Sequence, residues 1–263
     1  MPRHRLLATF ALCIPGLFAG MTAHAASPFN SAVATFEQTD TSGTWGINLA
    51  VDGNSNGVFD GTHPNAWSIH SPNNPSGESV AQTAYFRFAT PVTLTATNPR
   101  LELDLVQMFD PTKQNIIIST QFHTLGNFRI STTTANLNSS SFTLANAAAA
   151  SWTSMAPSFL GFTVPSGPTP TYSVDGTNAV LINSPGPALA TYNFVGSPGL
   201  ITITGIRLEV LEHSGLPTNG PGFAANGNFA LNEINAFAVP EPASLSLLGV
   251  AGAAILVRRR RSR

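Results

Sequence analysis

The segment Leu101-Glu102-Leu103-Asp104-Leu105 alternates strictly between leucines and acids. Successive side chains of a β-strand point to opposite faces of a sheet, so this pattern predicts a strand with one buried and one solvated face. Residues 84–88 and 128–131 show the same period of two. In residues 201–210 the apolar side chains change phase at Gly205, which predicts a β-bulge at that glycine.

The composition around these strands favours one all-β domain. The chain has 263 residues, of which 43% are hydrophobic and 10% are charged, and it contains 22 glycines and 20 prolines. A chain of this length and apolar content can bury a core, and clusters of glycine and proline between strands are typical of turns. Only the alanine-rich residues 145–150 favour a turn of helix. The pattern therefore predicts two antiparallel sheets packed as a sandwich.

Charge is distributed unevenly along the chain. Seven of the 12 basic residues lie near the two ends, and residues 26–239 hold five basic against twelve acidic residues, a net charge of −7. Binding to nucleic-acid phosphates requires a basic surface, so nucleic acid is excluded as a partner of this segment. The single cysteine, Cys13, precedes residue 26, so the segment can form neither a disulfide nor a thiolate metal site.

The amino-terminal residues have the form of a cleavable signal peptide. Arg3 and Arg5 supply positive charge, residues 6–21 are mainly apolar, and Ala23-His24-Ala25 has the small-x-small pattern that signal peptidase accepts. We therefore expect residues 1–25 to be removed by cleavage after Ala25. An uncleaved anchor is disfavoured because the apolar run is short and is interrupted by Pro15-Gly16.

The carboxyl-terminal residues have the form of a membrane anchor. Pro240-Glu241-Pro242 precedes an apolar stretch, and four arginines follow it at residues 258–261. Residues 245–257 would make a helix of roughly 20 Å, which is shorter than the hydrocarbon core of about 30 Å. We expect a marginal transmembrane helix at about 243–257 and a basic tail at 258–263. The arginines should stay cytoplasmic, which places the domain on the outer side of the inner membrane.

The order of Pro-Glu-Pro, short apolar helix and arginine cluster in residues 239–263 resembles the PEP-CTERM sorting signal of bacteria that have an exosortase. The resemblance implies processing by exosortase near Pro240-Glu241-Pro242 after transient anchoring in the inner membrane. It also implies a destination in the cell envelope, on the cell surface or in the extracellular matrix. The chain is thus divided into a signal peptide at 1–25, a β-sandwich at 26–238 and a sorting signal at 239–263.

Short segments of the middle domain follow the order of landmarks in the discoidin or galactose-binding-like jelly roll. They lie at residues 34–38, 50–54, 67, 86–88, 125–131, 152, 206–210 and 231–234. The domain therefore resembles this fold family over most of its length. The resemblance implies a two-sheet antiparallel jelly-roll sandwich, in which a glutamate of the last strand lies beside the Asp-Gly-Asn loop.

The segment that begins Asp52-Gly53-Asn54 places oxygen-bearing side chains at alternate positions around a glycine turn. This pattern lets several oxygens converge on a structural calcium ion. It is not an EF-hand loop, because the twelfth position is His63 instead of glutamate. A metal-free Asx turn, closed by hydrogen bonds, is the alternative. The predicted calcium ligands, including the glutamate that the resemblance implies, are Asp52, Asn54, Thr62 and Glu233.

The phase of Glu233 is the second argument for a cation. Glu233 falls on the same face as Phe229 and Leu231, which predicts that its carboxylate points toward the core if the strand is regular. An unpaired buried carboxylate is costly, so a positively charged partner is expected. Calcium is one candidate for this partner, and Arg207 is the other.

Four side chains are candidates for a sugar-binding platform at the loop end of the sandwich. Aromatic faces match the apolar face of a sugar ring, and polar side chains hydrogen-bond its hydroxyls. Packing in the core is the alternative for the two tryptophans, whereas a loop rich in glycine, proline and asparagine favours exposure of Phe223. The candidates are Trp67, His70, Trp152 and Phe223.

The sequence contains no recognisable catalytic pattern. Its histidines are scattered and lie in no arrangement with serine, aspartate or cysteine that would activate a nucleophile. The acids Glu102 and Asp104 are explained by the solvated face of one strand rather than by a glycosidase pair. We expect an exported, non-catalytic protein that binds extracellular polysaccharide. The alternatives are a structural matrix protein without a ligand and a polysaccharide hydrolase with an unrecognised site.

Overall fold

The computed structural model describes residues 28–40, 43–54, 65–70, 79–109, 123–137, 142–165, 169–183 and 189–239. The predicted signal peptide with Ala23 and Ala25, the proposed ligand Thr62, and the sorting signal with Pro240, Glu241 and Pro242 lie outside these ranges, as does the helix predicted at 243–257. Within the described ranges, no helix is long and apolar enough to cross a membrane.

The described strands form three antiparallel sheets. A seven-stranded sheet has the order β1-β4-β12-β6-β10-β9, with β7 paired to β6, and a four-stranded sheet has the order β13-β5-β11-β8. The strands of the larger sheet are β1 (Phe29–Ala34), β4 (Gln82–Thr93), β6 (Asn127–Thr133), β7 (Thr153–Ser154), β9 (Tyr172–Val174), β10 (Val180–Ile182) and β12 (Thr202–Val210). Those of the smaller sheet are β5 (Arg100–Gln107), β8 (Pro157–Thr163), β11 (Ala190–Gly196) and β13 (Glu233–Val239).

The remaining elements are short. β2 (Gln38–Asp40) and β3 (Gly43–Trp45) form a two-stranded sheet, and η1 (Ile47–Ala50) and η4 (Pro217–Asn219) are single 3-10 turns. The predicted turn of helix is present as α1 (Leu144–Ala149). Its first turn is capped by Thr143, whose side chain accepts a hydrogen bond from the Asn146 amide. The prediction of an all-β domain with antiparallel sheets is confirmed.

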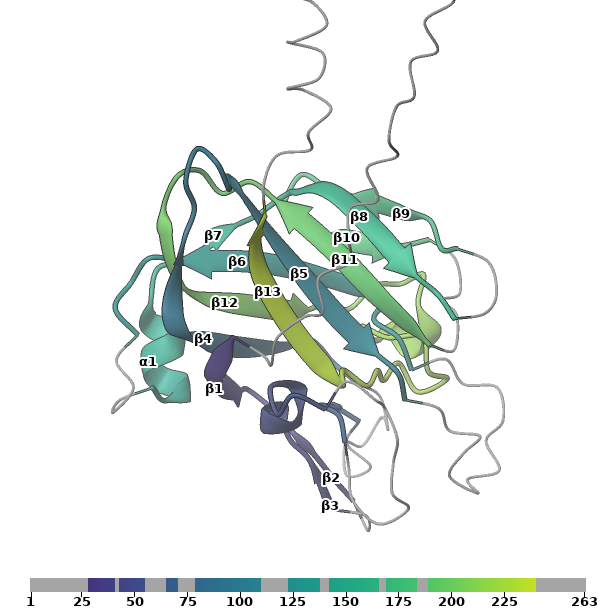
Figure 1. Cartoon of the computed structure of the whole chain (residues 1–263). Helices are drawn as coiled ribbons and strands as arrows, with labels where there is room; N and C mark the ends of the chain where they lie inside the picture. Colours follow the sequence, from purple (N-terminus) through teal and green to yellow (C-terminus); the bar gives the residue numbers. More distant parts are fainter. Residues whose placement is uncertain are drawn as a thin grey trace, which may run out of the picture.

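The two larger sheets pack face to face and enclose one hydrophobic core (Figure 1). The alternate leucines of β5 are fully buried in this core, and Ile206, Leu208 and Val210 of β12 are buried opposite them. Full burial of such a side chain contributes about 1.5–3 kcal/mol relative to exposure. The strands predicted from strict alternation therefore supply apolar side chains to the contact between the two sheets.

Consecutive long strands lie in opposite sheets. β4, β6, β10 and β12 belong to the seven-stranded sheet, whereas β5, β8, β11 and β13 belong to the four-stranded sheet. The chain therefore crosses from one layer to the other after most strands, as it does in jelly rolls. Because the crossings alternate between the two ends of the strands, loops from distant parts of the sequence gather at each end of the sandwich.

The irregularity predicted at Gly205 is confirmed, but the extra residues lie in its partner strand. Ile203 pairs with Val92, whereas Gly205 pairs with Arg87, so β4 has the longer segment between the two pairs. A Cβ atom at Gly205 would lie 2.7 Å from the carbonyl oxygen of Phe86. Glycine is therefore required for the close approach of β12 to β4 at this point.

Three charged side chains form an ion-pair network on the outer face of the seven-stranded sheet. Arg129 of β6 contacts both carboxylate oxygens of Glu209 at 2.8 Å, and Arg207 lies 3.0 Å from the same carboxylate. Burial alone would raise the pKa of Glu209, but the hydrogen bonds from Arg129 and the charge of Arg207 outweigh it. The pKa of Glu209 is therefore lowered.

Replacing Glu209 by Gln should lower the free energy of unfolding at pH 7 by about 1 kcal/mol, because two arginines lose their carboxylate. The folded-state pKa of Glu209 lies below its ordinary value of 4.5, so its stabilisation is present above that value and is lost as the pH falls through the lower folded-state pKa. Urea unfolding at pH 7 and at pH 3 measures the effect, and the two proteins should converge in acid.

The exposed Glu212 provides a matched control, because Glu212→Gln removes the same charge from the end of the same strand. This variant should keep the acid-dependent loss of stability of the unmodified protein. A stability difference between Glu209→Gln and the unmodified protein that stays constant from pH 7 to pH 3 would contradict the role of the ion pair.

Candidate functional site

Four described segments come together at one end of the sandwich, and we call this region the loop end. It consists of residues 43–54, 65–70, 123–126 and 211–232. Backbone hydrogen bonds join them: Trp67 pairs with Leu231, Leu125 pairs with Gly222, and the Ser68 amide donates to the Trp45 carbonyl. The segments are far apart in sequence but form one continuous hydrogen-bonded surface.

The predicted calcium loop and the last strand meet at the loop end. Gly53 has a positive φ of 82°, and its amide donates a hydrogen bond of 2.9 Å to Oε2 of Glu233. Oδ1 of Asp52 accepts a hydrogen bond of 2.8 Å from the Asn54 amide, which is an Asx turn. Glu233 therefore lies beside the loop that contains Asp52 and Asn54, which is the placement that the galactose-binding-like resemblance implies.

Glu233 is only 1% exposed, but the reason differs from the predicted one. Ile234 and Ala236 lie opposite Leu105 and Leu103 and point into the core, whereas Glu233 lies opposite Val106 on the other face of the sheet. The prediction that its carboxylate points toward the core is therefore wrong, because the phase changes before β13 begins. Glu233 lies instead against the loop that contains Gly53.

Arg207 does not fill the alternative role of partner to Glu233. Its Nη2 atom contacts Glu209 and donates to Oγ of Ser131, both on the outer face of the seven-stranded sheet. Its guanidinium carbon also lies 5.9 Å from the ring centroid of Trp152. Arg207 thus belongs to the opposite layer of the sandwich from β13.

The four candidate sugar-binding residues do not form one platform. Trp67 is fully buried, donates from Nε1 to the Phe36 carbonyl, and packs edge-on against Phe229. Trp67 therefore has the core-packing role that was the alternative for it, and its faces are not available to a ligand. Trp152 lies on the outer face of the seven-stranded sheet, where its ring is 5.5 Å from that of Tyr85.

The chain segments that carry His70 and Phe223 both hydrogen-bond to one buried asparagine, Asn228. The side chain of Asn228 accepts a hydrogen bond of 3.0 Å from the Ile69 amide, and the backbone carbonyl of Asn228 accepts a hydrogen bond from the Ala224 amide. These two amides belong to the neighbours of His70 and Phe223. His70 and Phe223 are both half-buried.

The loop that carries Phe223 is tightly packed. Gly227 has a φ of 73°, and a side chain on Gly222 would collide with the carbonyl of Asn228. The Phe223 amide donates to the Thr124 carbonyl, and its ring packs against the core. Phe223 therefore occupies a defined position instead of extending on a free loop, which lowers the entropic cost of binding a ligand.

The sequence analysis did not identify the buried amides beneath this surface. Asn228 is 4% exposed and also donates to Oε1 of Gln38, and Asn232 is fully buried with hydrogen bonds to Met108 and Asn65. Asn232 lies in a segment that carries the galactose-binding-like resemblance and Asn228 does not, and no local pattern indicates that either is buried. Their hydrogen bonds connect residues more than 100 positions apart, which explains why periodicity does not reveal them.

Among the residues that the structure describes, no three histidine, cysteine, aspartate or glutamate side chains form a cluster able to hold a metal ion. Within these ranges, the predicted calcium loop and β13 supply the carboxylates of Asp52 and Glu233 and the side-chain amide of Asn54.

Residues 238–261 match the family model of the PEP-CTERM protein-sorting motif. The chain therefore carries this sorting motif at its carboxyl-terminal side, and the prediction made from residues 239–263 is confirmed. The motif indicates an exported protein that exosortase processes on its way to the cell surface or the extracellular space. β13 ends at Val239, so the Pro-Glu-Pro sequence follows the last described strand directly.

Two solved structures are similar to this chain. One is the family 32 carbohydrate-binding module of NanJ from C. perfringens in complex with galactose, with 12% identity, a TM-score of 0.38, and coverage of 78% of this chain and 91% of that chain. The other is the module GH31 CBM32-2 bound to GalNAc, with 10% identity, a TM-score of 0.32, and coverage of 79% and 99%. No curated protein matches the chain in sequence.

Replacing Asn228 by Ala should lower the free energy of unfolding by roughly 1–3 kcal/mol, because the buried Ile69 amide and the Gln38 carbonyl group lose their partners. Asn183→Ala is the control, since it removes only an exposed hydrogen bond to Ser173 and should change stability by less than about 0.5 kcal/mol. Urea unfolding measures both values. Equal effects of the two substitutions would show that Asn228 does not hold the loop end together.

Proposed function

We propose that this chain is an exported, non-catalytic protein of the cell envelope or extracellular matrix, whose jelly-roll domain of the galactose-binding type binds carbohydrate at the loop end. The sorting motif at residues 238–261 supports the exported destination. In this proposal, signal peptidase removes residues 1–25, the helix at 243–257 anchors the precursor transiently in the inner membrane, and exosortase acts near Pro240-Glu241-Pro242.

The observation that carries the binding proposal is the arrangement of Phe223 and His70 around Asn228. An aromatic ring offers a face for the apolar side of a sugar, and an imidazole can hydrogen-bond a hydroxyl. Both residues are half-buried, and the amides of their neighbours Ile69 and Ala224 donate to the side chain and to the backbone carbonyl of Asn228. A ligand that binds there meets a surface whose groups are already in position.

Replacing Phe223 by Ala should weaken the binding of a neutral polysaccharide by about tenfold, because the sugar loses its stacking face. Affinity electrophoresis of residues 26–239 in gels that contain galactan, xylan or glucan measures the binding. Tyr172→Ala is the control, since Tyr172 is also aromatic and 37% exposed but lies on the edge strand β9. This control should bind as the unmodified protein does.

Two other outcomes separate the rival functions. If the unmodified protein binds none of these polysaccharides or other glycans on an array, the chain is better described as a structural matrix protein. If it releases new reducing ends from them, it is a hydrolase. Equal binding by Phe223→Ala and the unmodified protein would place the sugar elsewhere on the domain.

We also propose a structural calcium ion at the loop end, held by Asp52, Asn54 and Glu233 and, from outside the described residues, by Thr62. Its support is that two carboxylates far apart in the sequence, those of Asp52 and Glu233, accept hydrogen bonds from neighbouring amides of one loop. Carboxylate and amide oxygens are the ligands that Ca²⁺ prefers. A bound cation would neutralise these carboxylates and tie the loop to β13.

Calcium at about 100 times its dissociation constant should stabilise the protein by roughly 2.7 kcal/mol relative to chelator-treated protein. Glu233→Gln should abolish most of this response. Asp175→Asn is the control, because Asp175 forms a similar turn with the Thr177 amide in another loop. Thermal unfolding with calcium or chelator is the measurement. An unchanged midpoint after complete metal removal, with Glu233→Gln equally indifferent, would leave the metal-free Asx turn as the full description.

A further inference from the structure

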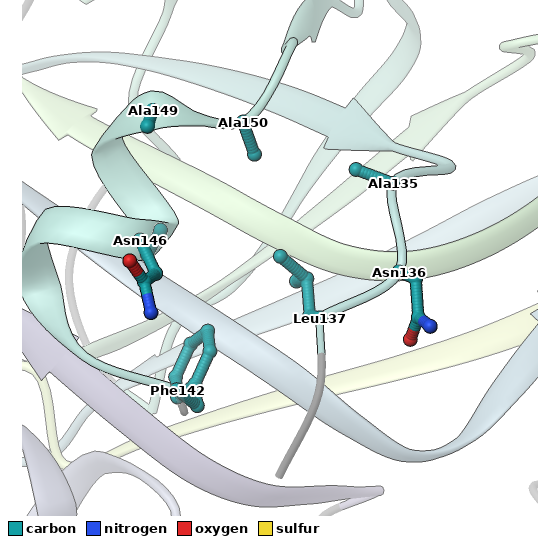
Figure 2. Close-up of a pocket in the computed structure, with 8 residues that line it drawn as sticks. Ala135, Asn136, Leu137, Phe142, Asn146, Ala149 and Ala150 are labelled. Atoms are coloured by element: carbon teal, nitrogen blue, oxygen red, sulfur yellow. The ribbon is translucent and has the colours of Figure 1, made fainter. Parts of the chain in front are cut away.

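Two adjoining hollows lie at the other end of the sandwich from the loop end. The first, of about 300 Å³, is lined by Leu137, Asn136, Phe142, Asn146 and the alanines at positions 135, 147, 149 and 150 (Figure 2). The second, of about 230 Å³, shares Leu137 and Asn136 with the first and is also lined by Arg87 and Thr204. Both are at or below the lower end of the usual size range of ligand pockets, so a ligand of one or two rings is the appropriate class.

The hollows and the loop end are separate sites. β6 begins at Asn127, next to the loop end, and ends at Thr133, just before the segment 135–137 that lines both hollows. A strand of this length spans roughly 20 Å. A small ligand in the hollows therefore does not reach Phe223.

Arg87 gives the second hollow a positive charge without a carboxylate partner. Its Nε atom donates to the Leu137 carbonyl at 2.8 Å, and its Nη1 atom donates to Oδ1 of Asn30 at 2.7 Å. Both acceptors are neutral, and no ion pair to Arg87 occurs in the described part of the chain. A guanidinium has more N–H donors than these two acceptors satisfy, so donors remain for an anion in the hollow.

The other arginines of the seven-stranded sheet, unlike Arg87, are paired with a carboxylate. Arg129 and Arg207 share the carboxylate of Glu209, so their charges are balanced within the protein. Residues 26–239 carry a net charge of −7, which disfavours anions at the surface in general. An anion that binds this domain therefore requires a local cation, and Arg87 supplies one inside a hollow.

Hydrogen bonds fix the walls of both hollows. Thr204 donates to the Ala135 carbonyl at 2.6 Å, which holds the segment 135–137 on β12, and Arg87 holds Leu137 on β4. On the other side, Trp152 donates from Nε1 to the Ala147 carbonyl and so holds α1 in place. The two hollows are thus built between fixed elements, and a ligand does not need to order them.

The first hollow has the chemistry of a site for a sugar ring. Figure 2 shows the Phe142 ring next to the Asn146 amide, with Leu137 facing them across the hollow. The ring, Leu137 and the alanines form an apolar lining, and the side-chain amide of Asn136 offers a donor and an acceptor for hydroxyls. Leu137 and Asn136 line both hollows, so the two hollows adjoin at these residues.

We propose that the paired hollows bind a uronic acid unit, with its ring against Phe142 and its carboxylate at the guanidinium of Arg87. The proposal rests on the proposed carbohydrate function for the class of ligand, and on Arg87 for the carboxylate. Arginine is suited to this role because its planar fork can donate two parallel hydrogen bonds to one carboxylate. The site would add selectivity for acidic polysaccharide to a domain that binds neutral sugars at the loop end.

Isothermal titration of residues 26–239 with trimers of galacturonate and of mannuronate tests the proposal, with their methyl esters as matched neutral ligands. The unmodified protein should bind at least one acid trimer at least about tenfold more tightly than its ester. Arg87→Gln should remove this preference. Arg100→Gln removes the same charge from β5 in the other sheet and should keep the preference, and Phe142→Ala should weaken binding of acid and ester alike.

Equal affinities of the unmodified protein for acid and ester, an undiminished preference in Arg87→Gln, or an equal loss in Arg100→Gln would each overturn the proposal. If Arg87→Gln does not fold, Arg87→Lys is measured instead, and it should keep part of the preference because the charge remains. Neutral polysaccharide that still binds through Phe223, with no uronate bound, would overturn this inference alone. Failure of every glycan to bind would overturn the carbohydrate function as well.

Discussion

The burial of one face of β5 is the constraint on which the other features of the domain depend. β5 pairs with β13 on one side and with β11 on the other, and its alternate leucines fill the core. Residues 26–239 contain no cysteine, so apolar contact rather than a disulfide must hold the two sheets together. The register on either side of β5 then determines where polar groups lie. This register places Glu233 opposite Val106 and Asn193 opposite Asp104. The carboxylate of Asp104 accepts a hydrogen bond of 2.6 Å from the side-chain amide of Asn193.

Periodicity was sufficient to predict β5 and parts of β4, β6 and β12, because alternation is a property of adjacent residues and these strands have one face in the core. It was not sufficient for Glu233, since the phase of the preceding residues does not continue into β13. Trp67 shows the same limit: its burial depends on contacts with Phe36 and Phe229 from distant segments. Asn228 and Arg87 acquire their roles only when loops from different strands come together. The four strands with strict alternation were therefore predictable from the sequence, and the composition of each surface required the tertiary structure.

The two ends of the sandwich have different chemical characters. At the loop end, buried amides support half-exposed rings, and the carboxylates of Asp52 and Glu233 accept hydrogen bonds from the backbone. At the opposite end, an arginine with neutral partners adjoins an alanine-rich wall. The crossing connections between the sheets produce this separation, because each end collects every second loop. One small domain can in this way present two surfaces that differ in charge and polarity.

The position of β13 has a consequence for the order of folding. Among the described strands, β13 lies at an edge of its sheet, and it is the last strand before the sorting motif. A chain that crosses a membrane amino end first delivers this strand after all the others. An edge strand can join a sheet without displacing strands that have already paired, so the late arrival of β13 does not require rearrangement of the core. Its pairing with β5 would nonetheless be completed only when the residues next to Pro240 have emerged. Completion of the fold and exposure of the sorting motif would therefore be nearly simultaneous.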